Sequence, residues 1–339
     1  MEEILSIQKK LVPEIIKIME KRYSILRQIS ISQPIGRRGL ASKIGMSERI
    51  VRTETELLKE QKLIEVYVSG MTITQEGIEI LNKLETSMNN IMGITNLQEQ
   101  VKTKLGIKKV LIAKGDFDQN ETVLKEVARK GAQYFESILK DGNIVSITGG
   151  STMLEFAKQI KTDKKYSEVV VVPARGSMGR EIEIQSNNIV ATVGNKLHAQ
   201  YKLLNIPDEL SEESMKTLIL EPEIKNTLDY INKMDIVIFG IGRVDEMAKR
   251  RRITQNKLDE ILEKGGVGEA FGHYFDEKGN VVCKLNTVGI DLETFKNVDE
   301  CIAIFAGTKK VNSLIALTKI NKNIVLVTDE KSARKILEQ

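Results

Sequence analysis

The chain from Lys108 onward contains short runs of apolar residues that alternate with helical patterns. Six such runs are present, with the sequences KVLIA, NIVSI, EVVVVPA, DIVIFGI, CIAIFAG and NIVLVTD. Strands that are apolar along their whole length belong to sheets buried on both faces, and the helices between them provide the cover. The pattern therefore predicts an α/β fold with a doubly wound, largely parallel sheet.

The first 90 residues contain no such run of strands, and we expect them to form a separate domain. Helical spacing in LVPEIIKIMEKRYSILRQIS predicts a core helix. Its buried stripe is expected to contain Ile15, Ile18 or Met19, Ile25 and Ile29. A short amphipathic helix that ends at Gly45 follows, and its apolar residues are Leu40, Ala41 and Ile44.

A second short helix is expected after Gly45, with Ser47 as its N-cap and Glu48 in its first turn. Its predicted inward face consists of Ile50, Val51, Leu57 and Leu58. Two short strands around Ser69 and Gly70 come next. The order of helix, helix-turn-helix and hairpin is typical of a winged-helix DNA-binding domain. The alternative is a helical bundle whose charges are only solvated.

Positive charge is concentrated in the same region. Between Ile35 and Leu63 there are seven Lys or Arg residues and four Glu residues. This local surplus suits the phosphates of double-stranded DNA, whereas the net charge of +4 for the whole chain indicates no polyanion by itself. The residues expected to contact operator DNA are Arg37, Arg38, Ser47, Glu48, Arg49, Arg52 and Thr53.

A long helix is predicted from Gln75 to about Leu105, with an apolar stripe of Leu81, Leu84, Met88 and Ile91. The stripe could pack on its own domain or pair two subunits, and we favour pairing because palindromic operators require it. A homo-oligomer, dimer or tetramer, is therefore expected. The predicted domains are residues 1–90, which bind DNA, residues 91–106, which form a linker helix, and residues 107–339, which bind an effector.

The segment IVSITGGST carries the clearest sign of a ligand. A buried strand here runs into Gly149 and Gly150, which let the backbone N–H groups approach an oxyanion closely. Ser151 and Thr152 add hydroxyl groups and could cap a helix that starts near Met153, whose N-terminus also favours anions. The prediction is a phosphate cradle, with an ordinary strand–helix turn as the alternative. No lysine follows the glycines, so this is not a nucleoside-triphosphate loop.

Basic residues follow other strands of the predicted sheet. Arg175 follows one strand, Gly307 to Lys310 another, and a run that ends in Arg250, Arg251 and Arg252 a third. Because parallel strands end at the same edge of a sheet, these groups are expected to converge near the glycines. Two cationic clusters indicate a ligand with two anionic ends, and Glu269 could accept hydrogen bonds from sugar hydroxyls.

Three functional classes are compatible with these features: a sensor, a sugar-phosphate isomerase or deaminase, and a DNA-binding scaffold whose glycine loop is only structural. An enzyme would need a positioned acid and base, and no pair is evident at the strand ends. Cys283 and Cys301 are too few for a disulfide framework, and the chain has no long apolar segment. We therefore expect a cytoplasmic, non-enzymatic sensor without metal or cofactor.

Seven segments, in this order, resemble the sorbitol-operon (SorC) family of transcriptional repressors. They are PIGRRGLASKIGMSERIVR, GMTITQEG, SITGGSTM, VVPARGSMG, GIGRVDEMAKRR, EAFGHYF and VTDE. The resemblance covers essentially the whole chain. It implies an N-terminal winged helix and a C-terminal sugar-phosphate-binding domain related to glucosamine-6-phosphate deaminases and ribose-5-phosphate isomerases. The branch with these motifs represses a glycolytic operon and responds to fructose 1,6-bisphosphate.

The resemblance also implies roles for single residues. One phosphate would be held by Gly149, Gly150, Ser151, Thr152 and Lys310. The other would be held by Arg175 and Arg250, with Gln185 and Glu269 towards the sugar. The deaminase motif with a histidine after GIG is absent from this chain, which argues against surviving catalysis.

Overall fold

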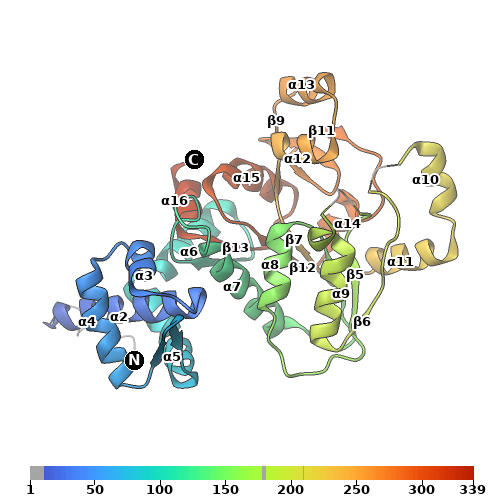
Figure 1. The fold of residues 1–339 in the computed structure, drawn as a ribbon. Coiled ribbons are helices and arrows are strands. Elements are labelled where there is room, and N and C mark those ends of the chain that lie inside the picture. Colours follow the sequence, from blue (N-terminus) through green and yellow to red (C-terminus); the bar gives the residue numbers. More distant parts are fainter. Residues whose placement is uncertain (1–10, 178–180, 209) are drawn as a thin grey trace. The chain divides into compact units, whose positions relative to one another are not determined.

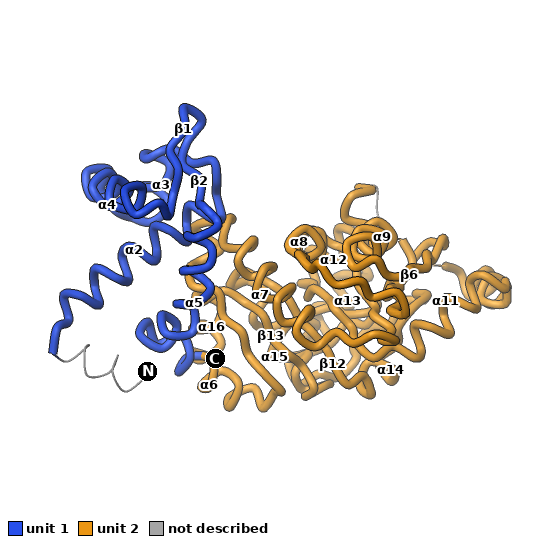
Figure 2. The backbone as a smooth tube through the Cα atoms, turned by 90° about the horizontal axis from the view of Figure 1, so that it is seen from below, with its two compact units in different colours: residues 1–97 blue, residues 98–339 orange. Residues whose placement is uncertain are grey.

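The structure is a computed structural model that describes residues 11–177, 181–208 and 210–339. The chain divides into two compact units, Met1–Leu97 and Gln98–Gln339, which Figure 2 shows in separate colours. We call them unit 1 and unit 2 and describe each by itself.

Unit 1 has the predicted winged-helix order. Its elements are α2 (Pro13–Ser32), α3 (Arg37–Ile44), α4 (Glu48–Glu60), β1 (Ile64–Tyr67), β2 (Gly70–Ile73) and α5 (Gln75–Ile91) (Figure 1). Gly45 ends α3 with a φ of 64°, in the left-handed region that suits glycine. Ser47 is the N-cap of α4, since its hydroxyl accepts a hydrogen bond from the Ile50 backbone N–H. β1 and β2 pair antiparallel as the hairpin.

The predicted stripe of α2 is only partly correct. Ile25 and Ile29 are buried, but Ile15 and Ile18 are 58% and 40% exposed. Met19, the predicted alternative to Ile18, is half-buried and packs against the core. In the first two turns of the helix the buried residue is Ile16. Periodicity identifies the face of a helix that is apolar, but it does not tell how far along the helix that face is covered.

The inward face of α4 also differs from the prediction. Val51 and Leu58 are buried, Leu57 is half-buried and Ile50 is exposed. The buried face passes instead through Glu54 and Thr55. Burial of the Glu54 carboxylate is compensated by ion pairs with Lys21 and Arg22 on α2, each with an N–O distance of 2.8 Å.

The predicted helix from Gln75 to Leu105 is interrupted. α5 ends at Ile91 and α6 (Ile94–Leu105) begins after Gly93, which has a φ of 74°. Leu81, Met88 and Ile91 are buried in the hydrophobic core of unit 1, with Leu84 packed against it. The preference for subunit pairing through this stripe is therefore wrong, because its own domain covers the stripe.

We predict that Met88→Ala destabilises unit 1 by about 2–5 kcal/mol, since Met88 is 0% exposed and its removal leaves a cavity. Ile15→Ala is the control and should change stability by no more than about 0.5 kcal/mol, because Ile15 is 58% exposed. Hydrogen exchange of the α2–α5 amides in the full chain measures both. Equal effects of the two substitutions would contradict the packing described here.

In the described part of unit 2, seven parallel strands form one sheet in the order β3-β13-β12-β7-β4-β5-β6. They are β3 (Lys109–Ala113), β4 (Ile144–Ile147), β5 (Val170–Pro173), β6 (Gln200–Tyr201), β7 (Ile236–Phe239), β12 (Glu300–Ile304) and β13 (Ile324–Asp329). All six predicted apolar runs are strands of this sheet. The predicted α/β fold is therefore confirmed.

Helices cover both faces of this sheet (Figure 1). The helices of unit 2 after α6 are α7 (Val123–Ile138), α8 (Ser151–Gln159), α9 (Ser186–Leu197), α10 (Glu212–Leu218), α11 (Pro222–Asn232), α12 (Val244–Arg251), α13 (Gln255–Glu263), α14 (Leu292–Asn297), α15 (Val311–Ile320) and α16 (Glu330–Glu338). On one face α7, α8 and α9 form the main core with alternate strand residues such as Ile147 and Ile238. On the other face Phe295 of α14 packs edge-to-face on Phe239 of β7, with ring centroids 5.4 Å apart.

A second sheet was not predicted from the sequence. Its antiparallel strands are β8 (Gly242–Arg243), β9 (Gly266–Ala270), β10 (His273–Asp276) and β11 (Val281–Lys284). It begins just after β7 and pairs Gly242 with Glu269. The second sheet thus brings Glu269 to the carboxyl edge of the main sheet.

Candidate functional site

A cavity of about 580 Å³ lies at the carboxyl edge of the main sheet, where loops from neighbouring strands meet. The Ala174 N–H donates to the Ile147 carbonyl at 2.9 Å, and the Thr148 N–H donates to the Ile238 carbonyl at 3.0 Å. The loops after β4, β5 and β7 are therefore held side by side. All nine residues predicted to bind the effector line this cavity: Gly149, Gly150, Ser151, Thr152, Arg175, Gln185, Arg250, Glu269 and Lys310.

The glycine loop forms one wall of the cavity. The Gly150 N–H donates to the Ile184 carbonyl at 2.8 Å, and a Cβ on Gly149 would lie 2.8 Å from that same oxygen. Gly150 has a φ of 118°, which residues with side chains rarely adopt. A glycine is therefore required at both positions for the loop to keep this shape.

Helix α8 begins earlier than predicted, at Ser151 and not near Met153. Gly150 occupies the N-cap position, so the prediction that Ser151 and Thr152 cap this helix is wrong. Neither hydroxyl has a hydrogen-bond partner among the described residues. Both hydroxyls and the first backbone N–H groups of α8 are thus available to a ligand.

Two cations complete what we call the cationic end of the cavity, which consists of 149–152, Arg250 and Lys310. The Arg250 guanidinium lies near the loop, with Nη1 4.0 Å from where a Cβ of Gly150 would be. Partial burial lowers the pKa of Lys310, and the nearby Arg250 and Arg243 lower it further. Among the described residues neither Lys310 nor Arg250 forms an ion pair. Glu246 lines the same cavity and raises the pKa of Lys310, but it forms no ion pair with either cation among the described residues.

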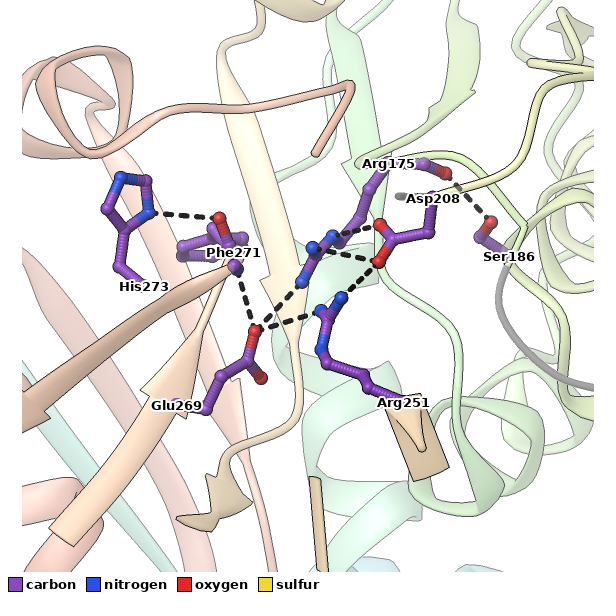
Figure 3. A network of polar contacts seen from close by, with 8 residues as sticks. Arg175, Ser186, Asp208, Arg251, Glu269, Phe271 and His273 are labelled. Carbon is purple, nitrogen blue, oxygen red and sulfur yellow. Dashed lines mark hydrogen bonds and ion pairs between the residues drawn. The ribbon is translucent and has the colours of Figure 1, made fainter. Parts of the chain in front are cut away.

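The other end contains four buried, mutually paired charges, which we call the arginine–carboxylate cluster: Arg175, Asp208, Arg251 and Glu269 (Figure 3). Arg175 Nε lies 2.7 Å from Asp208 Oδ1, and its Nη1 donates to Glu269 Oε1 at 3.0 Å. Arg251 also pairs with Asp208, and its Nη2 donates to Glu269 Oε1 at 3.1 Å. Figure 3 shows the two guanidinium groups lying between the two carboxylates.

The cluster favours the charged forms of Glu269 and Arg251. Burial alone would raise the pKa of Glu269, but Arg175 and Arg251 outweigh burial and the pKa is lowered. Burial would likewise lower the pKa of Arg251, but Glu269 and Asp208 raise it. Arg175 and Glu269, expected to face a ligand directly, are thus already bound to protein groups. Asp208 and Arg251 were not among the predicted site residues, because their partners are distant in the sequence.

Local backbone geometry fixes the cluster. Glu269 Oε1 also accepts the Gly272 N–H at 2.7 Å, across the turn that joins β9 to β10. In that turn Phe271 and Gly272 have φ values of 53° and 79°, which is unusual for a bulky residue such as phenylalanine. The Phe271 ring packs on Phe295, with centroids 4.9 Å apart, and this contact holds the turn in place.

Gln185 lies at the junction between a 3-10 turn (Ile182–Ile184) and α9. The next residue, Ser186, donates through its hydroxyl to the Arg175 carbonyl at 3.1 Å. The segment that carries Gln185 therefore touches both the glycine loop, through Ile184, and the strand end of Arg175.

In unit 1 the predicted DNA-contacting residues lie on or beside α3 and α4. All are exposed except Arg37, which is half-buried. Arg38 lies 3.5 Å from Glu48, and Arg52 lies 3.1 Å from Glu56. The remaining residues expected to contact DNA are Ser47, Arg49 and Thr53. Exposed ion pairs of this kind are weak, so the arginines can exchange a carboxylate for a phosphate at little cost.

Comparison with known proteins gives two family matches. The "Putative sugar-binding domain" family matches residues 89–338, and the CggR N-terminal DNA binding domain family matches residues 18–88. The central glycolytic genes regulator of Bacillus subtilis is 38% identical over 337 residues, and that of Priestia megaterium is 39% identical over 338 residues. Each match covers 99% of this chain and 99% of the relative. The chain belongs to the family of the central glycolytic genes regulators.

Solved structures agree with this family. A SorC family transcriptional regulator from Enterococcus faecalis is 31% identical, with a TM-score of 0.66, and the match covers 71% of this chain and 99% of that structure. The full-length sorbitol operon regulator from Klebsiella pneumoniae has a TM-score of 0.68 at 18% identity, over 90% of this chain and 94% of that structure, and supports the fold alone. The chain is therefore a transcriptional regulator with a DNA-binding and a sugar-binding domain, and not the enzyme considered as an alternative.

Among the described residues, no three His, Cys, Asp or Glu side chains are grouped as ligands for a metal ion. No helix in residues 11–177, 181–208 and 210–339 is both long and apolar enough to cross a membrane.

We predict that Glu269→Ala lowers the free energy of unfolding of unit 2 by about 3–5 kcal/mol, because it leaves two buried arginines with one carboxylate. Glu246→Ala is the control: Glu246 is exposed and pairs weakly with Arg243, so its loss should cost less than about 1 kcal/mol. Urea denaturation without ligand measures both. A small effect of Glu269→Ala would show that the cluster is not needed for the fold.

Proposed function

We propose that this regulator represses a glycolytic operon and that fructose 1,6-bisphosphate relieves the repression. The protein would bind double-stranded operator DNA in the cytoplasm as a homo-oligomer. The names of the Bacillus subtilis and Priestia megaterium relatives support the glycolytic target, and the matched sugar-binding domain supports a sugar ligand. Because Leu81, Met88 and Ile91 are buried within unit 1, subunits would pair through other surfaces.

The observation that carries the effector proposal is the cationic end of the cavity, where Lys310 and Arg250 form no ion pair with the described residues. A phosphate there would receive N–H groups from the start of α8, the hydroxyls of Ser151 and Thr152, and the charges of Lys310 and Arg250. Charge-assisted hydrogen bonds of this kind are stronger than neutral ones. A free sugar carries no charge and would gain none of this attraction.

The rest of the cavity suits the sugar and the second phosphate of the ligand. The sugar would lie toward Gln185 and Glu269, and the second phosphate would lie toward Arg175. Arg250 was expected to serve the second phosphate, but its position near Gly150 favours the first. A volume of about 580 Å³ lies within the usual range for small-ligand sites.

Relief of repression requires that the effector bind the DNA-competent and DNA-incompetent states with different affinities. By linkage, operator DNA must then weaken effector binding by the same factor. The effector therefore acts by shifting an equilibrium and is released unchanged. Nuclear magnetic resonance of the ligand during a DNA titration distinguishes this action from turnover.

We predict that fructose 1,6-bisphosphate raises the melting temperature of the regulator, because a ligand that binds only the native state stabilises it. Lys310→Ala and Thr152→Ala should each remove most of this increase, since both residues line the cationic end. Lys309→Ala is the matched control and should retain it, because Lys309 is exposed and does not line the cavity. An equal increase with free fructose would contradict a phosphate-binding role for this end.

We predict that Arg49→Ala and Arg52→Ala each weaken operator binding, by about 1–3 kcal/mol where the arginine reads a base. Where the arginine contacts a phosphate instead, the slope of log affinity against log salt concentration should decrease by about one phosphate contact. Lys59→Ala, in the last turn of the same helix, is the control and should bind operator normally. Fluorescence anisotropy at several salt concentrations measures all three. Unchanged affinity in both arginine variants would refute α4 as the recognition helix.

A further inference from the structure

Arg175 lines the cavity, but its charge is already balanced. The arginine–carboxylate cluster contains two arginines and two carboxylates, so its formal charge is zero, whereas the cationic end has Lys310 and Arg250 without an ion pair among the described residues. A second phosphate near Arg175 therefore meets carboxylates as well as a guanidinium. Like charges brought together in a buried site repel strongly. One of the two carboxylates therefore has to move away from Arg175 before a phosphate can bind this arginine tightly.

The two carboxylates of the cluster are held differently. Glu269 is bound by both arginines and by the Gly272 backbone N–H at 2.7 Å. The Asp208 carboxylate is bound by the two arginines, with Arg175 Nε 2.7 Å from Oδ1 and Arg175 Nη2 3.1 Å from Oδ2. Only Oδ2 accepts hydrogen bonds in this contact, because the buried Oδ1 has no hydrogen-bond partner among the described residues. A phosphate can accept hydrogen bonds from both nitrogens of one guanidinium edge, so it would satisfy Arg175 better than Asp208 does.

We propose that the Asp208 carboxylate occupies the place of the ligand's second phosphate on Arg175 when the cavity is empty. The proposal rests on the proposed function, because it takes the ligand to be a phosphorylated sugar. Asp208 is then a specificity-determining residue: a sugar monophosphate fills the cationic end and leaves the Arg175–Asp208 pair intact. A sugar bisphosphate displaces Asp208 from Arg175.

The backbone around Asp208 connects this exchange to the surface of unit 2. The Asp208 N–H donates to the Ser177 carbonyl at 2.9 Å, and the Val288 N–H donates to the Asp208 carbonyl at 3.1 Å. The same segment leads into α10, a helix with no buried residue. Loss of the ion pairs of Asp208 therefore loosens a segment that has few other contacts, whereas a monophosphate has no effect there.

The first experiment compares two ligands by calorimetry, with Asp208→Asn. Asparagine keeps the shape of the side chain and removes its charge, so the bisphosphate no longer competes with a carboxylate. The affinity for fructose 1,6-bisphosphate should rise on the order of tenfold, and that for fructose 6-phosphate should stay within about twofold. The proposal would be overturned if the affinity for the bisphosphate, relative to that for the monophosphate, stayed the same or fell. If Asp208 had only a structural role, removing its charge would not favour the bisphosphate.

Glu246→Gln is the matched control. Glu246 also lines the cavity, but it lies near Lys310 and not in the cluster, and it raises the pKa of that lysine. Neutralising Glu246 should increase the affinity for both ligands to a similar extent and leave the ratio of the two affinities unchanged. A ratio that rises as much in Glu246→Gln as in Asp208→Asn would mean that general charge, and not the Asp208 position, sets the preference.

A second measurement uses the unaltered protein and so does not depend on folding of a variant. Hydrogen exchange of residues 210–221 should accelerate with fructose 1,6-bisphosphate and stay unchanged with fructose 6-phosphate. The same response to both ligands, or no response to the bisphosphate, would overturn the proposal. If the unaltered protein binds neither sugar phosphate, the proposed function fails and this inference fails with it. If both ligands bind and these differences are absent, the inference alone fails.

Discussion

The mutual neutralisation of Arg175, Asp208, Arg251 and Glu269 is the interaction on which unit 2 depends. These residues come from the end of β5, a loop, α12 and β9, and they join the main sheet to the antiparallel sheet. Removing charges from water is costly, and each one is tolerated here because two opposite charges face it. Such a cluster is not the most stabilising use of buried volume, but in the absence of ligand it ties the four segments to one another.

The division of the cavity follows from this cluster. The strand-end loops of a parallel sheet gather backbone N–H groups and side chains at one edge, and at the cationic end Lys310 and Arg250 form no ion pair with the described residues. At the opposite end the protein supplies both arginines and both carboxylates. One end is thus prepared to attract an anion from solution. We propose that the other distinguishes among ligands already held by the first.

Local patterns in the sequence were sufficient for most of the architecture. The six apolar runs and the Ser47 cap depend on neighbours within a few residues, and the structure has each of them as predicted. Contacts between distant segments were not accessible in this way. Ile15 and Ile50 have the right spacing for burial but are 58% and 42% exposed, and Arg175 is bound to Asp208 and Glu269, 33 and 94 residues away.

Two adjacent arginines at the end of α12 have opposite environments: Arg250 is exposed beside Gly150, and the Arg251 side chain is buried between two carboxylates. Successive residues of a helix project about 100° apart, so the number of residues between β7 and this point decides which arginine enters the cluster. Deletion of one residue from α12 would rotate the Arg251 guanidinium out of the cluster and place a different side chain there. The length of this segment is therefore under tighter constraint than the identity of most of its residues, and homologous regulators should accumulate substitutions here while excluding insertions and deletions.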